Sequence, residues 1–210
     1  MSIVKLSNIS KEYKGKVVFN NFSLAVEKGD YIAVTGKSGA GKTTLLNIIG
    51  LLESPDSGTI TILDYTNPNI NKKDGRLLVK EHIGYLFQNF ALIENYTAKR
   101  NIELVCKIKK ISFSDEKVQK ILSKLGINDL MDKKIFQLSG GEQQRIALAR
   151  LFIKEPTILL ADEPTASLDP ENSEIVLNAI SELNNNGTTV ILVTHNPDIV
   201  NRANKSIKIN

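Results

Sequence analysis

The 210-residue sequence has a single cysteine and no long apolar run. Cys106 has no second cysteine to pair with, which excludes a disulfide-stabilised scaffold and fits a reducing cytoplasm. A membrane-spanning helix needs about 18 consecutive apolar residues, and no stretch approaches that length. The first residues, 1–5, continue into polar alternation and lack the apolar core of a signal peptide. These absences predict a soluble intracellular domain without a membrane segment of its own.

The chain also lacks a strong excess of one charge. Its 27 Lys and Arg residues outnumber its 23 Asp and Glu residues by four, which gives a formal net charge of +4. The lysines form short separate runs at 72–73, 107–110 and 133–134, without the basic stripe and interleaved aromatic residues of a nucleic-acid groove. We therefore expect them on solvated faces and expect no nucleic-acid partner. Weak attraction to anionic lipid headgroups stays open as an alternative.

No internal repeat or low-complexity linker divides the chain, and 41% hydrophobic residues suffice for one sizeable core. Two segments alternate apolar and polar residues, which is typical of half-buried antiparallel strands: 4–8 and 22–26. Three short apolar runs are typical of strands covered on both faces of a parallel sheet: 31–35, 158–161 and 190–193. Each of these three leads into a polar turn and a helical pattern, as in repeated strand–turn–helix units.

Between residues 84 and 138 the sequence pattern becomes more typical of α-helices than of strands. Ser114 is a candidate cap for a helix that Gly126 would end, with apolar positions at Val118, Ile121, Leu122 and Leu125. The sequence thus predicts a single α/β domain over residues 1–210, built on a parallel sheet with a smaller antiparallel β region on its N-terminal side. A helical insert is expected around residues 89–136.

Residues 36–43 fit the phosphate-binding pattern G-x-x-x-x-G-K-[ST]. The strand predicted at 31–35 precedes them, and a helical pattern over 43–49 follows, with Gly50 as its terminator. Glycines let consecutive backbone N–H groups face an anion, and the helix N-terminus adds its dipole. A glycine-rich turn without a ligand is the alternative, but the full pattern in this context predicts a nucleoside triphosphate site. Its expected contacts are Gly36, Lys37, Ser38, Gly39, Ala40, Gly41, Lys42, Thr43 and Thr44.

Catalytic parts are expected beside this loop. Lys42 would reach the β and γ phosphates, and the Thr43 hydroxyl would join the shell of Mg²⁺. Asp162 and Glu163 follow the buried run 158–161, at the strand end where ligands of open α/β sheets gather. Asp162 is expected to hold Mg²⁺ and Glu163 to polarise the attacking water. Two solvated acids in a turn are the alternative, which the presence of the phosphate loop disfavours.

A second anion site is predicted at residues 139–142. Ser139 and Glu142 have the spacing of a capping box at the start of a helix that runs to about residue 154. A cap alone gives no reason for Gly140 and Gly141, since each glycine costs about 1 kcal/mol against alanine in a helix interior. Glycines there allow exposed N–H groups to approach an anion. The γ-phosphate of the ATP bound by this chain is already held by residues 36–43. We therefore expect residues 139–142 to contact the nucleotide of a second copy, which implies a dimer with ATP between the facing surfaces of the two chains.

At residues 138–145, Leu-Ser-Gly-Gly-Glu-Gln-Gln-Arg resembles the signature of the ATP-binding-cassette (ABC) family, and the resemblance to its nucleotide-binding subunits covers residues 3–209. It implies that Tyr13 stacks on adenine and that Gln88 links the magnesium site to a transmembrane partner. Asp169 matches the family's D-loop, although it also has the pattern of a helix cap before Pro170. His195 matches the switch histidine that contacts the γ-phosphate.

The resemblance implies a catalytic set of Glu163, His195 and Gln88, with ATP and Mg²⁺ as cofactors. Thr43, Gln88 and Asp162 would be the metal ligands. A neutral imidazole donates from one nitrogen and accepts at the other, which suits a bridge between phosphate, water and Glu163. The other histidine, His82, has no such context and is given no role.

The stretches 83–92 and 97–102 are similar to a subgroup with MacB-type, lipoprotein-releasing and bacteriocin-export ATPases, although Ala166 and Ser167 replace the Gly-Asn common there. The implied function is an ATP-hydrolysing subunit that dimerises on ATP and drives a separate transmembrane permease, for peptide, bacteriocin or lipoprotein export. It would be peripheral, at the inner face of the cell membrane. Signalling through a membrane protein to a cell-wall hydrolase remains an alternative. An ABC-type ATPase of DNA repair is disfavoured because the chain has no long coiled coil, and one of translation because it has no second cassette. A small-molecule kinase is disfavoured by the second anion site predicted at residues 139–142.

Overall fold

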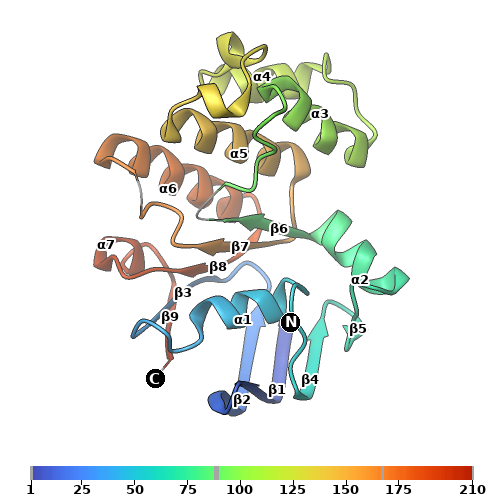
Figure 1. The fold of residues 1–210 in the computed structure, drawn as a ribbon, viewed down its shortest axis with the longest axis vertical. Helices are drawn as coiled ribbons and strands as arrows, with labels where there is room; N and C mark the ends of the chain where they lie inside the picture. Colours follow the sequence, from blue (N-terminus) through green and yellow to red (C-terminus); the bar gives the residue numbers. More distant parts are fainter. Residues whose placement is uncertain (1, 88–89, 167, 210) are drawn as a thin grey trace.

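A five-stranded parallel sheet forms the centre of the protein in a computed structural model, which describes residues 2–87, 90–166 and 168–209 (Figure 1). Its strand order is β6-β7-β8-β3-β9. The three apolar runs predicted as buried strands occupy the interior positions of the sheet, and β8 is buried at every residue. The prediction of a parallel sheet is confirmed. Its strands are β3 (Tyr31–Gly36), β6 (Ile83–Leu86), β7 (Ile158–Asp162), β8 (Thr189–Val193) and β9 (Lys205–Ile209).

A second sheet is antiparallel and has the order β2-β1-β4-β5. β1 and β2 contain the two alternating segments, and a tight turn at Lys14 and Gly15, both at positive φ, joins them. This confirms the antiparallel region on the N-terminal side. Its strands are β1 (Ser2–Tyr13), β2 (Lys16–Glu27), β4 (Ser57–Ile62) and β5 (Tyr65–Thr66).

Helix α1 (Lys42–Ile49) lies between the two sheets, where its buried leucines and isoleucines join residues from both. Gly50 is its C-cap, as predicted. Helices α5 (Gly140–Lys154) and α6 (Pro170–Asn185) cover the other face of the parallel sheet. Along β7, Ile158 and Leu160 belong to the α1 side and Leu159 and Ala161 to the α5 side, because successive residues of a strand face opposite ways.

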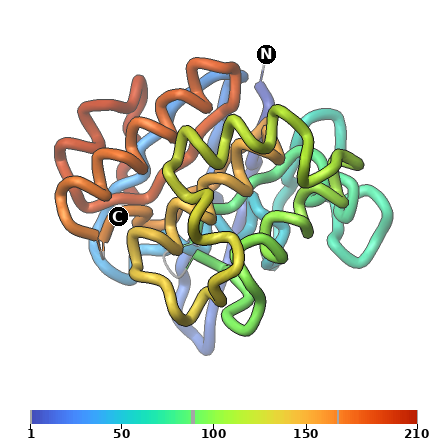
Figure 2. The backbone as a smooth tube through the Cα atoms, turned by 90° about the horizontal axis from the view of Figure 1, so that it is seen from above, coloured from blue at the N-terminus to red at the C-terminus, as the bar shows by residue number. Residues whose placement is uncertain are grey.

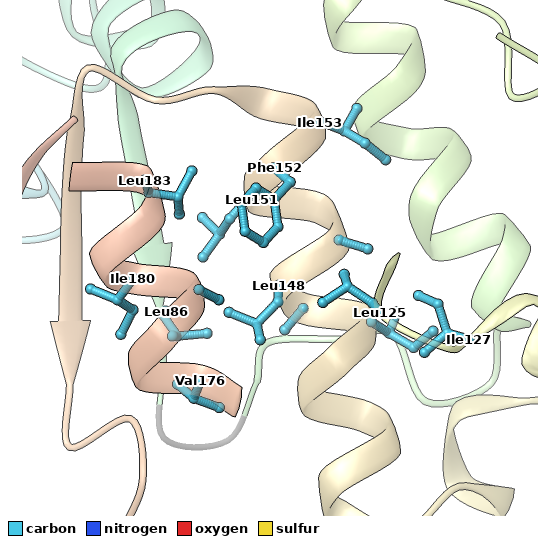
Figure 3. Close-up of a cluster of buried hydrophobic side chains, with 14 of the residues drawn as sticks. Leu86, Leu125, Ile127, Leu148, Leu151, Phe152, Ile153, Val176, Ile180 and Leu183 are labelled. Atoms are coloured by element: carbon cyan, nitrogen blue, oxygen red, sulfur yellow. The ribbon is translucent and has the colours of Figure 1, made fainter. Parts of the chain in front are cut away.

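The α5 side of the sheet holds the larger hydrophobic cluster. Figure 3 shows Leu148 and Leu151 of α5 meeting Val176 and Ile180 of α6, with Leu86 from the end of β6 beside them. This packing ties the helix that begins after Ser139 to the edge of the sheet. The position of that helix N-terminus is therefore fixed by the core.

Two helices fall within the predicted helical insert, α3 (Ala98–Lys109) and α4 (Glu116–Lys124), and both pack against α5 (Figure 2). The predicted cap of α4 was wrong by one residue. Asp115 accepts from the Lys117 N–H, whereas the Ser114 hydroxyl pairs with that of Ser112. The buried face of α4 is as predicted at Val118 and Leu122.

Several short elements were not predicted individually: α2 (Lys73–Leu77), a π-helical turn (Leu78–His82), two 3₁₀ turns (Asn128–Leu130 and Ile135–Gln137) and α7 (Pro197–Val200). Among the described residues, no helix combines the length and apolar character needed to cross a membrane.

Candidate nucleotide-binding site

A cavity of about 380 Å³ opens at the carboxyl edge of the parallel sheet. Four segments distant in sequence surround it: the β1–β2 hairpin, the loop between β3 and α1, the end of β7 and the segment after β8. Its volume lies in the range of small-molecule sites. Its lining residues are Tyr13, Lys16, Val18, Ser38, Gly39, Gly41, Lys42, Thr43, Thr44, Asp162, Glu163, Val193 and His195.

In the loop between β3 and α1, two glycines are also needed for packing against neighbouring strands of the same chain. At Gly36, where φ is 147°, a Cβ atom would stand 2.2 Å from the Ile209 carbonyl oxygen. At Gly41, where φ is 101°, it would stand 2.4 Å from Cγ1 of Val18. The loop is therefore clamped between β9 and β2 in a conformation that other residues cannot adopt without strain.

Three residues of the predicted phosphate loop do not line the cavity: Gly36, Lys37 and Ala40. The carbonyl oxygens of Gly36 and Lys37 instead accept hydrogen bonds from Nζ of Lys42, each at 3.0 Å, and Ala40 packs on the hydrophobic core. Lys42 is only 7% exposed. Since an ammonium group has three N–H donors, these two bonds to described residues leave one for a ligand in the cavity.

Asp162 ends β7 and Glu163 follows it in a left-handed conformation, with φ of 45°. The Glu163 N–H donates to the Val193 carbonyl at 3.0 Å, which holds this residue against the end of β8. Its Oε1 atom is buried and has no hydrogen-bond partner among the described residues. Burial raises the pKa of Glu163, and nearby His195 opposes the rise. A half-buried carboxylate with an unused oxygen in a polar cavity has the properties of a general base.

The two histidines lie in different parts of the fold. His195 is on the wall of the cavity, and its Nε2 lies 3.4 Å from Oε1 of Glu163, within ion-pair distance but without hydrogen-bond alignment. His82 lies directly before β6, at the opposite edge of the sheet, where its Nδ1 is 3.0 Å from the Thr157 hydroxyl.

Tyr13 lines the cavity as well. Its hydroxyl donates to the Glu53 carboxylate, Nζ of Lys11 stands 5.2 Å from its ring centroid, and 40% of the residue is exposed. The hydroxyl is thus held by Glu53, while part of the residue stays exposed on the cavity. Lys16 and Val18, which no sequence pattern indicated, follow it on β2.

The predicted residues at the start of α5 form a second group, outside the cavity lining. Ser139 and Glu142 make the predicted capping box: Ser139 N–H donates to the Glu142 carboxylate at 2.7 Å, and Glu142 N–H donates to the Ser139 hydroxyl at 3.3 Å. At Gly141 a Cβ atom would stand 2.6 Å from Oδ1 of Asn172, so any larger residue here would have to displace the Asn172 side chain. At Gly140 a Cβ atom would meet nothing within 4 Å. Close approach of an outside anion thus explains Gly140 only.

Asn172, on the first turn of α6, connects this group to the D-loop position. Its N–H and Nδ2 donate to the two carboxylate oxygens of Asp169, at 2.8 and 2.7 Å, and its Oδ1 accepts from Arg145 at 3.2 Å. Asp169 is the N-cap of α6, with Pro170 in the first turn, as predicted. Gln88 and Ser167, two further predicted positions, lie outside the described residues.

The sequence profile of the ABC transporter family matches residues 19–166, a span with the β3–α1 loop, the start of α5 and the acids at the end of β7. The chain belongs to this family. The prediction from the signature at residues 138–145 is confirmed.

Named relatives in this family lie in the predicted subgroup. The macrolide export ATP-binding/permease protein MacB of Campylobacter jejuni is 39% identical over 99% of this chain, which spans 33% of MacB. The lipoprotein-releasing system ATP-binding protein LolD of Aquifex aeolicus is 36% identical over 99% of this chain and 93% of LolD. The bacitracin export ATP-binding protein BceA of Halalkalibacterium halodurans is 37% identical over 94% of this chain and 81% of BceA.

Among solved structures, the post-hydrolysis dimer of the ATP-binding cassette MJ0796, bound to ADP and Pi, superposes with a TM-score of 0.87. It is 34% identical and the match covers 99% of this chain and 94% of that one. The ABC ATPase fold of this chain is confirmed.

Proposed function

We propose that the chain binds and hydrolyses ATP as a head-to-tail dimer and drives a separate transmembrane permease. The observation that carries this proposal is the division of the predicted residues into two groups. One lines the cavity, and the other surrounds the start of α5, outside that lining. The related MJ0796 cassette is a dimer in its post-hydrolysis state with ADP and Pi, which supports the pairing of two copies around nucleotide.

In this proposal the β3–α1 loop holds the phosphates of ATP. Lys42 donates its free N–H to the β and γ phosphates, and the N-terminus of α1, with Thr43 and Thr44, faces the same anion. At that N-terminus, among the described residues, no side chain caps the helix, so its backbone N–H groups are free for a ligand. Tyr13 stacks on the adenine.

The metal ligands fit Mg²⁺, because the Thr43 hydroxyl and the Asp162 carboxylate are oxygen donors and both residues line the cavity. Gln88 is proposed as a further ligand. When bound, Mg²⁺ neutralises charge between the β and γ phosphates.

The Glu163 carboxylate accepts the proton of the attacking water, and His195 holds water and γ-phosphate in line with it. The Ser139 hydroxyl and the Gly140 N–H contact the γ-phosphate held by the partner copy. Gly141 and Glu142 shape that helix start, and Asp169 lies at the contact between copies. Each hydrolysis site then needs residues from two chains, so closure is driven by ATP contacts that the open state lacks.

The relatives named for lipoprotein release, bacitracin export and macrolide export support an export role. The first two support a peptide, bacteriocin or lipoprotein substrate. MacB is named as both ATP-binding protein and permease, which supports a permease as the partner of this chain. We propose attachment through that permease at the inner face of the cell membrane. Identification of the membrane protein that co-purifies with the full chain tests this part directly.

The test of the dimeric ATP site is the Glu163→Gln variant in analytical ultracentrifugation with ATP and Mg²⁺. The substitution keeps the shape of the side chain and removes the base, so ATP should persist and the chain should sediment as a dimer. A variant that binds ATP and stays monomeric contradicts the proposal. Lys42→Ala is the matched control, in which lost ATP binding should abolish the dimer.

A further inference from the structure

We infer that Lys16 is an additional nucleotide ligand that binds the α-phosphate, and that it sets affinity for ATP and ADP alike. This inference rests on the nucleotide site proposed above. Lys16 is the first residue of β2, and it pairs with Tyr13 across the turn at residues 14–15. Directly paired residues of antiparallel strands project to the same face. The Lys16 ammonium and the Tyr13 ring are therefore on the same side of the hairpin.

That side faces the β3–α1 loop. Val18 lines the same cavity as Lys16, and Cγ1 of Val18 lies 2.4 Å from the Cβ position of Gly41. Nζ of Lys16 itself lies 3.6 Å from the Cβ position of Gly39. The strand thus directs the ammonium onto the phosphate loop.

The charge of Lys16 has no partner among the described residues. Within residues 2–87, 90–166 and 168–209, the Lys16 side chain takes part in no ion pair or hydrogen bond, although the side chain of Lys11 on the neighbouring strand pairs with Glu53 and Asp56. Both residues lie on the same hairpin, but only Lys16 lines the cavity. A solvated lysine that faces a phosphate loop without an acidic partner is suited to an anionic ligand.

The order of groups in a nucleotide decides which phosphate Lys16 meets. Adenine is joined through ribose to the α-phosphate, and the β and γ phosphates follow. With the base on Tyr13 and the β and γ phosphates at Lys42, the part of the cavity between them receives ribose and the α-phosphate. Lys16 stands beside Tyr13 and over Gly39, on this middle part. Its ammonium donates to an α-phosphate oxygen.

ATP and ADP share the α-phosphate, so this contact predicts equal effects on both nucleotides. Removing it should not change which nucleotide the site prefers, whereas loss of a γ-phosphate ligand would weaken ATP alone. The contact also holds ADP after hydrolysis. Lys16 therefore slows product release as well as retaining substrate.

The experiment is isothermal titration calorimetry of the full chain with ATP and ADP, each with Mg²⁺, for wild type, Lys16→Gln and Lys16→Arg. We expect Lys16→Gln to raise both dissociation constants by the same factor, about fivefold to tenfold, as for one charge-assisted hydrogen bond near solvent. Lys16→Arg should restore most of the affinity, since arginine keeps the charge and the donors. Lys14→Gln is the matched control, because Lys14 is an exposed lysine of the same turn that does not line the cavity.

Unchanged affinities in Lys16→Gln would overturn the inference, and a loss confined to ATP would overturn the assignment to the α-phosphate. An equal loss in Lys14→Gln would show only a general effect of charge and would also overturn it. A wild-type chain that fails to bind ATP would instead contradict the proposed function itself, so the two failures are distinguishable.

Discussion

Gly140→Ala separates the folding of the monomer from the pairing of two chains. The substitution adds one methyl group to the first residue of α5, where a Cβ atom meets nothing within 4 Å. No contact of the isolated chain is lost. Alanine is favoured over glycine by up to about 1 kcal/mol in a helix interior and by less near a helix end. The melting temperature should therefore stay the same or rise by at most about 2 to 4 °C.

The expected effect on the dimer has the opposite sign. If the Gly140 N–H meets the partner's γ-phosphate, the new methyl group stands in the way of that contact. A hydrogen bond to a charged group is worth about 1.5 to 3 kcal/mol, and every 1.4 kcal/mol corresponds to a tenfold change in equilibrium constant. ATP-dependent dimerisation should thus weaken by about tenfold or more, while ATP binding to the monomer is unchanged.

The assay compares Glu163→Gln with the double variant Glu163→Gln/Gly140→Ala in analytical ultracentrifugation with saturating ATP, together with melting curves. Gly141→Ala is the control for a change in the fold, since its Cβ atom would stand 2.6 Å from Oδ1 of Asn172 and should lower the melting temperature. If the double variant dimerises as strongly as Glu163→Gln alone, Gly140 does not face the partner's nucleotide and the reasoning is refuted.

Two further predictions concern pH. Burial raises the pKa of Glu163 above 4.5, so its contribution to stability is greatest below pH 4.5 and falls as pH rises through the folded pKa. In urea titrations of the nucleotide-free chain, the free energy of unfolding of wild type relative to Glu163→Gln should therefore fall as pH rises above 4.5. A difference that stays constant with pH would contradict this prediction. Burial lowers the pKa of Lys154 from 10.5 to about 8 while its Nζ donates to the Val79 and Ile83 carbonyls. The unfolded chain then binds more protons in that window, so wild type should gain stability relative to Lys154→Met between pH 8 and 10.5, and a parallel pH profile of the two would refute the shift.

Local patterns predicted the interior of the parallel sheet and the phosphate loop. β3, β7 and β8 are continuous apolar runs because helices cover both faces of the sheet, so each run carries its own signal. The short strands β4 and β5 were not predicted, since their place depends on pairing with β1 and with each other rather than on their own residues. The cap of α4 was predicted at Ser114, but the Ser114 hydroxyl is hydrogen-bonded to the Ser112 hydroxyl, and Asp115 accepts from the helix instead.

Contacts between distant segments could not be predicted. The reason for Gly141 is the side chain of Asn172, which is 31 positions away in sequence on another helix. The place of Lys16 beside Gly39 depends on the packing of β2 against the β3–α1 loop. Sequence patterns named the chemical groups of the site, whereas tertiary packing decided which of them share one cavity.

A cross-link between the two halves of the proposed site tests the shared ATP site most directly. Chains carrying Ser38→Cys and chains carrying Ser139→Cys, both with Glu163→Gln, are mixed and treated with a short bis-maleimide, with and without ATP. Cys106 is buried at 2% exposure, so the introduced thiols are the reactive ones, and each variant alone is the control. We predict a covalent dimer in the mixture that requires ATP; a cross-link that ignores ATP, or none although ATP binds, would contradict a site built from two chains.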